Sequence, residues 1–261
     1  MSTHSSHICT RRHFLRLGAG AALVILPVNR KGTVFAGAGE PETHVVSIAK
    51  VRNGDIPAAV EEAIALLGGI AQVTAGKQRI LLKPNLVAEG AAYTTKPAVI
   101  RTLTRLMLDA GKEVCIGEGS AFATGFNLVG DSGYITRCPD LLERLQRLVF
   151  DRLGYTAMTK SLGVPLLNLH VGDLVTVPVP HGLFWKEIVL HRILTEVDLL
   201  CSVPMMKTHQ LATVTLGLKN LIGCYPGACY GTAESYLRPE NKKITLPIHN
   251  WVQLRPAAQC W

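Results

Sequence analysis

Three short polar clusters each follow an apolar, strand-like run. They are Lys83-Pro84-Asn85, Gly117-Glu118-Gly119-Ser120 and Lys207-Thr208-His209. A further polar pair, Lys219-Asn220, comes soon after the third cluster. In open α/β sheets, ligands bind beyond the carboxyl ends of the strands. We therefore expect these clusters to contribute to one shared site.

The chemistry of this set is that of an anion-binding site. Its members are Lys83, Asn85, Glu118, Lys207, His209, Lys219 and Asn220. Ammonium and amide groups favour a carboxylate, a phosphate or an enolate-like intermediate. The candidates for catalysis are His209, Lys207 and Glu118. Glu118 has three possible roles, as a general base, a metal ligand or the counter-ion of buried lysines. Lys83, Asn85, Lys219 and Asn220 are the candidates for ligand binding, although Lys219 late in a helix would also complement the helix dipole.

Cysteine and other nucleophile patterns are weaker. No C-x-x-C occurs, so neither a zinc ribbon nor a ferredoxin-type cysteine run is encoded. Cys224 and Cys229 lie in a loop rich in Gly, Pro and Tyr and are the candidates for a disulfide or a metal site. Ser120 lacks a G-x-S-x-G elbow, which leaves a hydrolase triad unsupported. The histidines His170, His181 and His191 fit no familiar ligand spacing and are interpreted as surface residues.

The elements that would position these residues alternate between strand and helix. Strands are predicted at His44–Val51, Arg79–Leu82, Glu113–Ile116, Val164–Leu169, Leu174–Val179 and Leu199–Val203. Helices are predicted at Ile56–Leu67, Pro97–Ala110, Pro139–Leu153 and Leu211–Leu221. This alternation predicts an α/β fold with a mostly parallel, doubly wound sheet and helices on both faces.

The first 38 residues read as an export signal. Thr10-Arg11-Arg12-His13-Phe14-Leu15 resembles the twin-arginine translocation motif, and the uncharged run Leu17–Leu26 is too short to span a membrane. Small residues at Ala36-Gly37-Ala38 suggest cleavage near Ala36 or Ala38. We therefore expect a signal peptide at 1–38 and a single α/β domain at 39–261. The twin-arginine translocase would export the folded protein to the periplasm or another extracytoplasmic space. No stable transmembrane span is expected.

Net charge gives little support to a nucleic-acid partner. The chain has 27 Lys and Arg against 19 Asp and Glu, a formal charge of +8. Five of the basic residues and none of the acidic ones lie in residues 1–38, so 22 basic and 19 acidic residues remain, a net of +3. After Lys31 the chain has no long basic run, and nucleic-acid binding is not expected.

Taken in order, the motifs resemble the family known as domain of unknown function 362 (DUF362). The segments that carry the resemblance are Leu82-Lys83-Pro84-Asn85-Leu86-Val87, Thr95-Lys96-Pro97, Gly117-Glu118-Gly119-Ser120, Lys207-Thr208-His209 and Gly217-Leu218-Lys219-Asn220-Leu221-Ile222-Gly223. The resemblance runs from about residue 45 to 225 and implies an α/β domain often found in iron–sulfur proteins. It implies no settled reaction.

The end of the chain differs from that family pattern. Members continue well past the last motif, whereas here Leu254–Trp261 shows no periodicity, and we expect a C-terminally incomplete domain. Three functional hypotheses stay open at this stage. The first is an exported enzyme or enzyme-like protein that binds a small anionic ligand. The others are a redox accessory protein with an iron–sulfur cluster or another metal, and a non-catalytic remnant.

Overall fold

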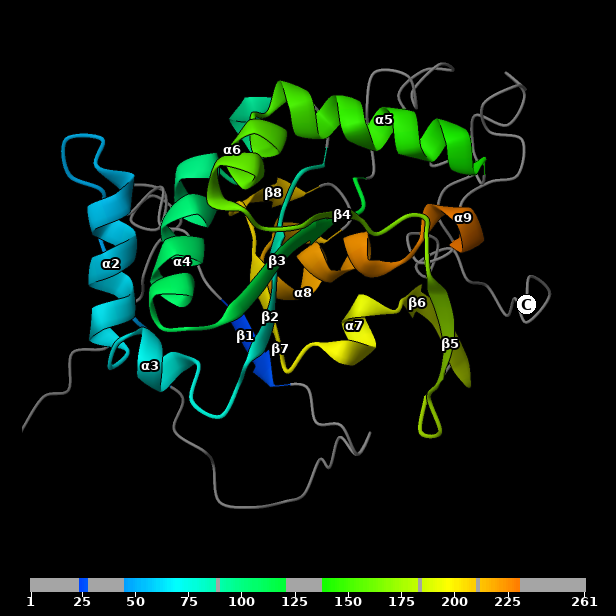
Figure 1. The fold of residues 1–261 in the computed structure, drawn as a ribbon, viewed down its shortest axis with the longest axis horizontal. Helices are drawn as coiled ribbons and strands as arrows, with labels where there is room; N and C mark the ends of the chain where they lie inside the picture. The colour runs from blue at the N-terminus through cyan, green and yellow to red at the C-terminus, as the bar shows by residue number, and fades with distance from the viewer. Residues whose placement is uncertain are drawn as a thin grey trace, which may run out of the picture.

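The central element of the fold is a five-stranded sheet in the order β1-β7-β2-β3-β4 (Figure 1). The computed structural model describes residues 24–27, 45–87, 90–120, 138–182, 185–209 and 212–230. The strands of the sheet are β1 (Val24–Pro27), β2 (Arg79–Pro84), β3 (Glu113–Glu118), β4 (Leu166–Asn168) and β7 (Leu199–Val203). Strands β7, β2, β3 and β4 run parallel to one another, whereas the edge strand β1 pairs antiparallel with β7. The predicted mostly parallel sheet is confirmed.

Strand β2 lies at the centre of the sheet because its residues are apolar on both faces. Ile80, Leu81 and Leu82 are each fully buried. Alternate residues point to opposite faces of a strand. Accordingly, Ile80 and Leu82 belong to one hydrophobic cluster and Leu81 to a second one.

Helices cover both faces of the sheet, as the alternating pattern predicts (Figure 1). The larger cluster joins the sheet to α2 (Ile56–Leu66), α3 (Ile70–Val73), α4 (Pro97–Asp109), α5 (Pro139–Arg152) and α6 (Tyr155–Leu162). The smaller cluster joins it to α7 (Ile193–Glu196) and η2 (Leu221–Cys224). Helix α2 begins where Asp55 caps it, with the Ala58 amide donating to the Asp55 carboxylate at 3.0 Å.

The remaining elements are short. Two antiparallel hairpins lie outside the central sheet, β5 (Leu174–Pro178) with β6 (Glu187–His191), and β8 (Lys207–His209) with β9 (Thr213–Thr215). The other elements are η1 (Ala91–Tyr93), α8 (Gly217–Asn220) and α9 (Gly227–Tyr230).

Two predicted elements are wrong. In the predicted strand His44–Val51, residues 45–51 form no strand, and Val46 and Ile48 are 80% and 84% exposed. In the predicted helix Leu211–Leu221, residues 213–215 form strand β9 instead, and only the part at 217–220 is α-helical, as α8. Thr213 has a φ of 61°, a left-handed conformation that starts no right-handed helix, and the β-branched run 213–215 favours a strand.

The two ends of the chain lie mostly outside the described residues. The predicted signal at 1–38 is described only at 24–27, where part of the apolar run forms β1 on the edge of β7. Residues 231–261, with Cys260 and the last stretch Leu254–Trp261, are also outside them. Within the described part, no helix has the length and apolar character needed to cross a bilayer.

Candidate functional site

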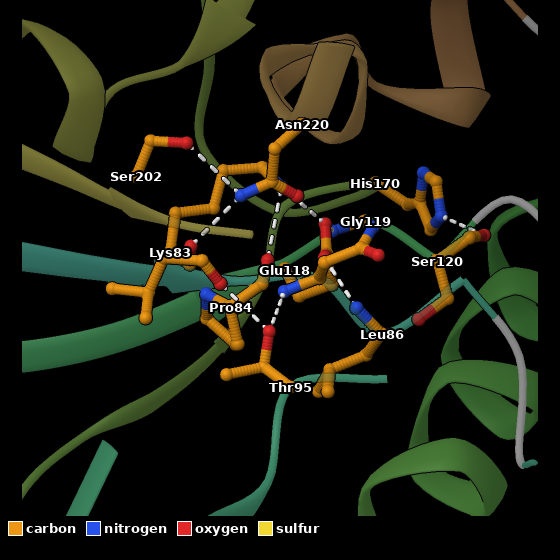
Figure 2. Close-up of polar contacts among 12 residues, drawn as sticks. Lys83, Pro84, Leu86, Thr95, Glu118, Gly119, Ser120, His170, Ser202 and Asn220 are labelled. Carbon is orange, nitrogen blue, oxygen red and sulfur yellow. Dashed lines mark hydrogen bonds and ion pairs between the residues drawn. The ribbon is translucent and has the colours of Figure 1, made fainter. Parts of the chain in front are cut away.

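A buried ion pair lies at the carboxyl ends of β2 and β3. The Lys83 ammonium is 2.8 Å from Glu118 Oε1, and the two side chains are 0% and 3% exposed. The Glu118 carboxylate also accepts hydrogen bonds from the amides of Leu86 at 2.9 Å and Gly119 at 2.8 Å. These partners satisfy a charge that would otherwise be costly to bury. The arrangement (Figure 2) favours the reading of Glu118 as the counter-ion of a buried lysine.

Asn220 connects this ion pair to the neighbouring strand. Its Oδ1 accepts from Lys83 Nζ at 3.2 Å, and its Nδ2 donates to the Lys83 carbonyl and to Ser202 Oγ, both at 3.0 Å. The Ser202 hydroxyl in turn donates to the Gly217 carbonyl at 3.1 Å. Lys83 and Ser202 are paired in register, so Asn220 fastens α8 to the ends of β2 and β7. We call Lys83, Glu118, Asn220 and Ser202 the buried clamp.

Two motif glycines allow the backbone to cover the clamp. A Cβ at Gly223 would collide with Glu118 Oε1 and would lie 2.7 Å from Lys83 Nζ. A Cβ at Gly119 would lie 2.7 Å from the Gly223 carbonyl oxygen and 3.0 Å from a ring carbon of His170. Both positions therefore require glycine for reasons of space. This close approach keeps water away from the ion pair.

Hairpin β8–β9 carries the partly exposed part of the site. Lys207 pairs with Thr215 and His209 with Thr213, so these four residues lie on one face of the hairpin. Lys207 Nζ donates to the Tyr93 carbonyl at 2.5 Å and lies 5.6 Å from the centre of the Tyr93 ring. The Thr215 hydroxyl is buried and has no hydrogen-bond partner among the described residues.

The cationic groups of this region depress one another's pKa. Burial and the charge of Lys219 lower the pKa of Lys207 from 10.5 to about 8. Burial and the charge of Lys83 lower the pKa of Lys219. Burial, Lys219 and Lys207 lower the pKa of His209 in the same way. We call Lys207, His209 and Lys219 the basic cluster.

Asn85 follows the end of β2 and contacts Thr95. The backbone N–H of Asn85 donates to Thr95 Oγ1 at 2.9 Å, and the Thr95 hydroxyl donates to the Val203 carbonyl at 2.7 Å. The side-chain Oδ1 of Asn85 is buried and has no hydrogen-bond partner in the described part of the chain. Thr95 thus ties the ends of β2 and β7 to the segment that holds Tyr93. Sequence reasoning noted Thr95 only as part of a motif.

His170 is a site residue that sequence reasoning missed. It was expected at the surface, but it is fully buried. Its Nε2 lies 2.9 Å from the Ser120 carbonyl, to which it donates, because its Nδ1 accepts from the Gly227 amide at 3.0 Å. Burial lowers the pKa of His170 to about 4, so the imidazole is neutral at pH 7. It holds α9 against the end of β3 (Figure 2 shows the Ser120 side).

The cysteines do not assemble a metal centre within the described residues. Cys224 and Cys229 are not joined in a disulfide. Burial raises the pKa of the Cys224 thiol to about 11, which disfavours the thiolate that metals bind. No three His, Cys, Asp or Glu side chains of the described ranges are grouped closely enough to hold an ion. Cys224 and Cys229 therefore do not fit an iron–sulfur cluster.

The motif residues of this site belong to a recognised sequence family. The family described as Domain of unknown function (DUF362) matches residues 80–244, more than half of the chain. This chain is a member of the DUF362 family. Its buried clamp and basic cluster both lie within the matched residues, so the motifs that carried the resemblance are the ones that build the site.

One curated relative shows how far the similarity extends. The "Thylakoid-associated protein sll1697" of Synechocystis sp. is 25% identical over 177 residues. The alignment covers 67% of this chain but 47% of that protein, so the chain spans about half the relative's length. No solved structure matches the chain.

Proposed function

We propose that this DUF362 protein binds a small anionic ligand at the basic cluster, beyond the carboxyl ends of β2 and β7. The observation that carries the proposal is an excess of positive charge. Glu118 neutralises Lys83 within the clamp. Lys207 and Lys219 form no ion pair with a carboxylate among the described residues, and the charge of Lys219 depresses the pKa of Lys207. A bound anion would relieve this repulsion.

Two unsatisfied polar atoms support a ligand at this place. The Thr215 hydroxyl lies on the same hairpin face as Lys207, and the second atom is the buried Oδ1 of Asn85, at the end of β2. Buried polar atoms without a partner are uncommon in native proteins and call for a ligand or a water molecule. A hydroxyl can donate to a carboxylate or phosphate oxygen. The Asn85 carbonyl oxygen would suit a ligand hydroxyl.

The two groups of motif residues have different roles in this proposal. The clamp positions the strand ends and α8, whereas the basic cluster contacts the ligand. His209, two residues from Lys207 on the same face, is placed for proton transfer to a bound ligand. Proton transfer by Glu118 stays a prediction from the sequence, since its carboxylate is already engaged by Lys83 and two amides.

Export is a second part of the proposal and rests on the sequence. The Arg11-Arg12 motif precedes an apolar run and small residues, the order found in twin-arginine signals. Replacing both arginines by lysine and fractionating the cells tests it. Retention of the variant in the cytoplasm supports export by the twin-arginine translocase. An unchanged distribution contradicts it.

Isothermal titration calorimetry with oxalate and with inorganic phosphate tests the ligand proposal. We expect saturable binding that weakens about tenfold or more when Lys219→Gln removes one charge, a loss of about 1.4 kcal/mol. The matched control is Lys96→Gln, because the Lys96 ammonium only donates to the Ala91 carbonyl at 2.7 Å. Equal loss in both variants, or no binding of either anion, would contradict the proposal.

A further inference from the structure

We propose that Lys207 is an amine nucleophile that forms an imine with the carbonyl group of a small 2-oxo acid. This inference rests on the proposed function and names its substrate class. It is carried by the position of the amine, which is half-buried on hairpin β8–β9 with its Nζ bound to the Tyr93 carbonyl and a second lysine nearby.

The Tyr93 carbonyl orients the Lys207 amine. It accepts one hydrogen from Nζ at 2.5 Å, and the Tyr93 ring lies 5.6 Å from the same nitrogen. A neutral amine that donates one hydrogen to this carbonyl keeps its lone pair for attack on a carbon atom. The contact thus fixes the direction of the nucleophile in both of its protonation states.

The neighbouring charges favour the neutral amine. A lysine becomes nucleophilic at moderate pH when it is desolvated beside another cation. Burial and Lys219 lower the pKa of Lys207 to about 8, against 10.5 for an ordinary lysine. The Glu118 carboxylate raises the pKa of Lys207, but this carboxylate is paired with the Lys83 ammonium at 2.8 Å. The buried clamp therefore limits how strongly Glu118 can stabilise the Lys207 cation.

The proposed step balances with groups of this chain. The Lys207 nitrogen attacks the carbonyl carbon, and the C=O electron pair moves to the oxygen. Both protons of the amine pass in turn to that oxygen, the first giving the carbinolamine and the second allowing the oxygen to leave as water when the C=N bond forms. No oxidant or reductant is needed. His209 shares the hairpin face with Lys207, and its Nδ1 accepts from the Ala212 amide at 3.1 Å, so the neutral ring carries its proton on Nε2 and acts as a hydrogen-bond donor towards the oxygen.

The carboxylate of the substrate is what selects a 2-oxo acid over a neutral aldehyde. Lys219 has no hydrogen bond or ion pair to another described residue and lies close enough to Lys207 to lower its pKa. A carboxylate adjacent to the reacting carbonyl would bind Lys219 while Lys207 attacks. The Thr215 hydroxyl, opposite Lys207, supplies a donor for the same ligand.

Borohydride trapping tests the inference. The purified protein is incubated at pH 8 with pyruvate or glyoxylate, reduced with sodium cyanoborohydride, digested and mapped by mass spectrometry. We expect a reduced adduct on Lys207, with labelling that exceeds that of other lysines by on the order of a hundredfold, the ratio of neutral amine expected from the two pKa values. The peptide map needs only the unmodified chain, so it does not depend on a variant that folds.

Matched variants separate the possible outcomes. Lys207→Arg should remove the adduct, Lys219→Gln should reduce it, and Lys96→Gln should leave it unchanged. Labelling spread evenly over the lysines, or none at all, overturns the inference. Oxalate, which has no ketone or aldehyde carbonyl, distinguishes the two proposals. If oxalate binds but no adduct forms on Lys207, the imine is wrong and anion binding stands. If oxalate does not bind and no adduct forms, the proposed function is overturned as well.

Discussion

The Lys83 ammonium and the Glu118 carboxylate form an ion pair at 2.8 Å with side chains that are 0% and 3% exposed. Because three donors already occupy the Glu118 carboxylate, this pair gives the two motif residues a structural role at the strand ends. The motifs of this chain therefore combine a structural group with a ligand-binding group. Substitutions in the two groups should have different consequences.

Breaking the buried pair should reduce stability. Glu118→Gln leaves the Lys83 charge buried without its counter-ion, and we expect the free energy of unfolding to fall by about 3–5 kcal/mol. Urea denaturation measures it. The matched control is Glu62→Gln, because the Arg52–Glu62 pair is on the surface, where such pairs contribute at most about 1 kcal/mol.

A second substitution should compensate for the first. In the double variant Lys83→Met with Glu118→Gln, no charge remains buried, so it should be more stable than Glu118→Gln alone. A double variant less stable than either single variant would show that the pair is not the source of the loss. Anion affinity should persist in any of these variants that fold.

Gly223→Ala should be more destabilising than an alanine at an open glycine. The added Cβ would collide with Glu118 Oε1 and crowd Lys83 Nζ at 2.7 Å, so we expect a loss of about 3 kcal/mol or more. Gly76→Ala is the comparison. It has a φ of +68° and open space around its Cβ, and should cost about 1–2 kcal/mol for the left-handed backbone alone. Equal losses in thermal or urea unfolding would refute the close approach.

His170 should make the fold sensitive to acid. Burial lowers its folded pKa from 6.5 to about 4, with Glu118 and Lys83 acting in opposite directions. As the pH falls below 6.5, the unfolded chain takes up the proton first, so this stabilisation is complete above pH 6.5 and is lost towards pH 4. The expected loss is about 3 kcal/mol.

The variant His170→Gln isolates that contribution. It should be less stable than the wild type at pH 7, but its free energy of unfolding should fall less steeply between pH 6.5 and 4. His181→Gln, at an exposed position, should keep the wild-type pH dependence. If the curves of wild type and His170→Gln run parallel over this range, the buried neutral imidazole is not responsible.

Local sequence patterns were sufficient to predict the central strands and the long helices. Continuous apolar runs such as the one at 79–82 predicted buried parallel strands, and apolar residues at helical spacing predicted α2, α4 and α5. The rule that parallel strands end at one edge of the sheet predicted that Lys83 and Glu118 lie near one another, whereas Asn220 reaches them from α8. The same rule could not tell which motif residues belong to the buried clamp and which to the basic cluster. That division depends on the three-dimensional contacts between segments far apart in the sequence.

The errors have physical causes that local patterns do not contain. The segment 45–51 alternates like a strand, but strand formation needs a hydrogen-bonding neighbour, and none lies beside it in the described residues. His170 lies two residues after the end of β4, so the rule that polar residues at strand ends build the site also applies to it. Metal-ligand spacing does not identify such a residue, because the partners of a buried histidine are commonly backbone groups.

Proton uptake on anion binding is the measurement closest to the central claim. Titrating oxalate at pH 8 in two buffers of different ionisation enthalpy gives the number of protons taken up. An anion bound beside Lys207 must raise its pKa from about 8, so binding should be accompanied by proton uptake that disappears in Lys207→Gln. Binding without proton uptake, or uptake that Lys207→Gln leaves unchanged, would contradict a ligand site at the basic cluster.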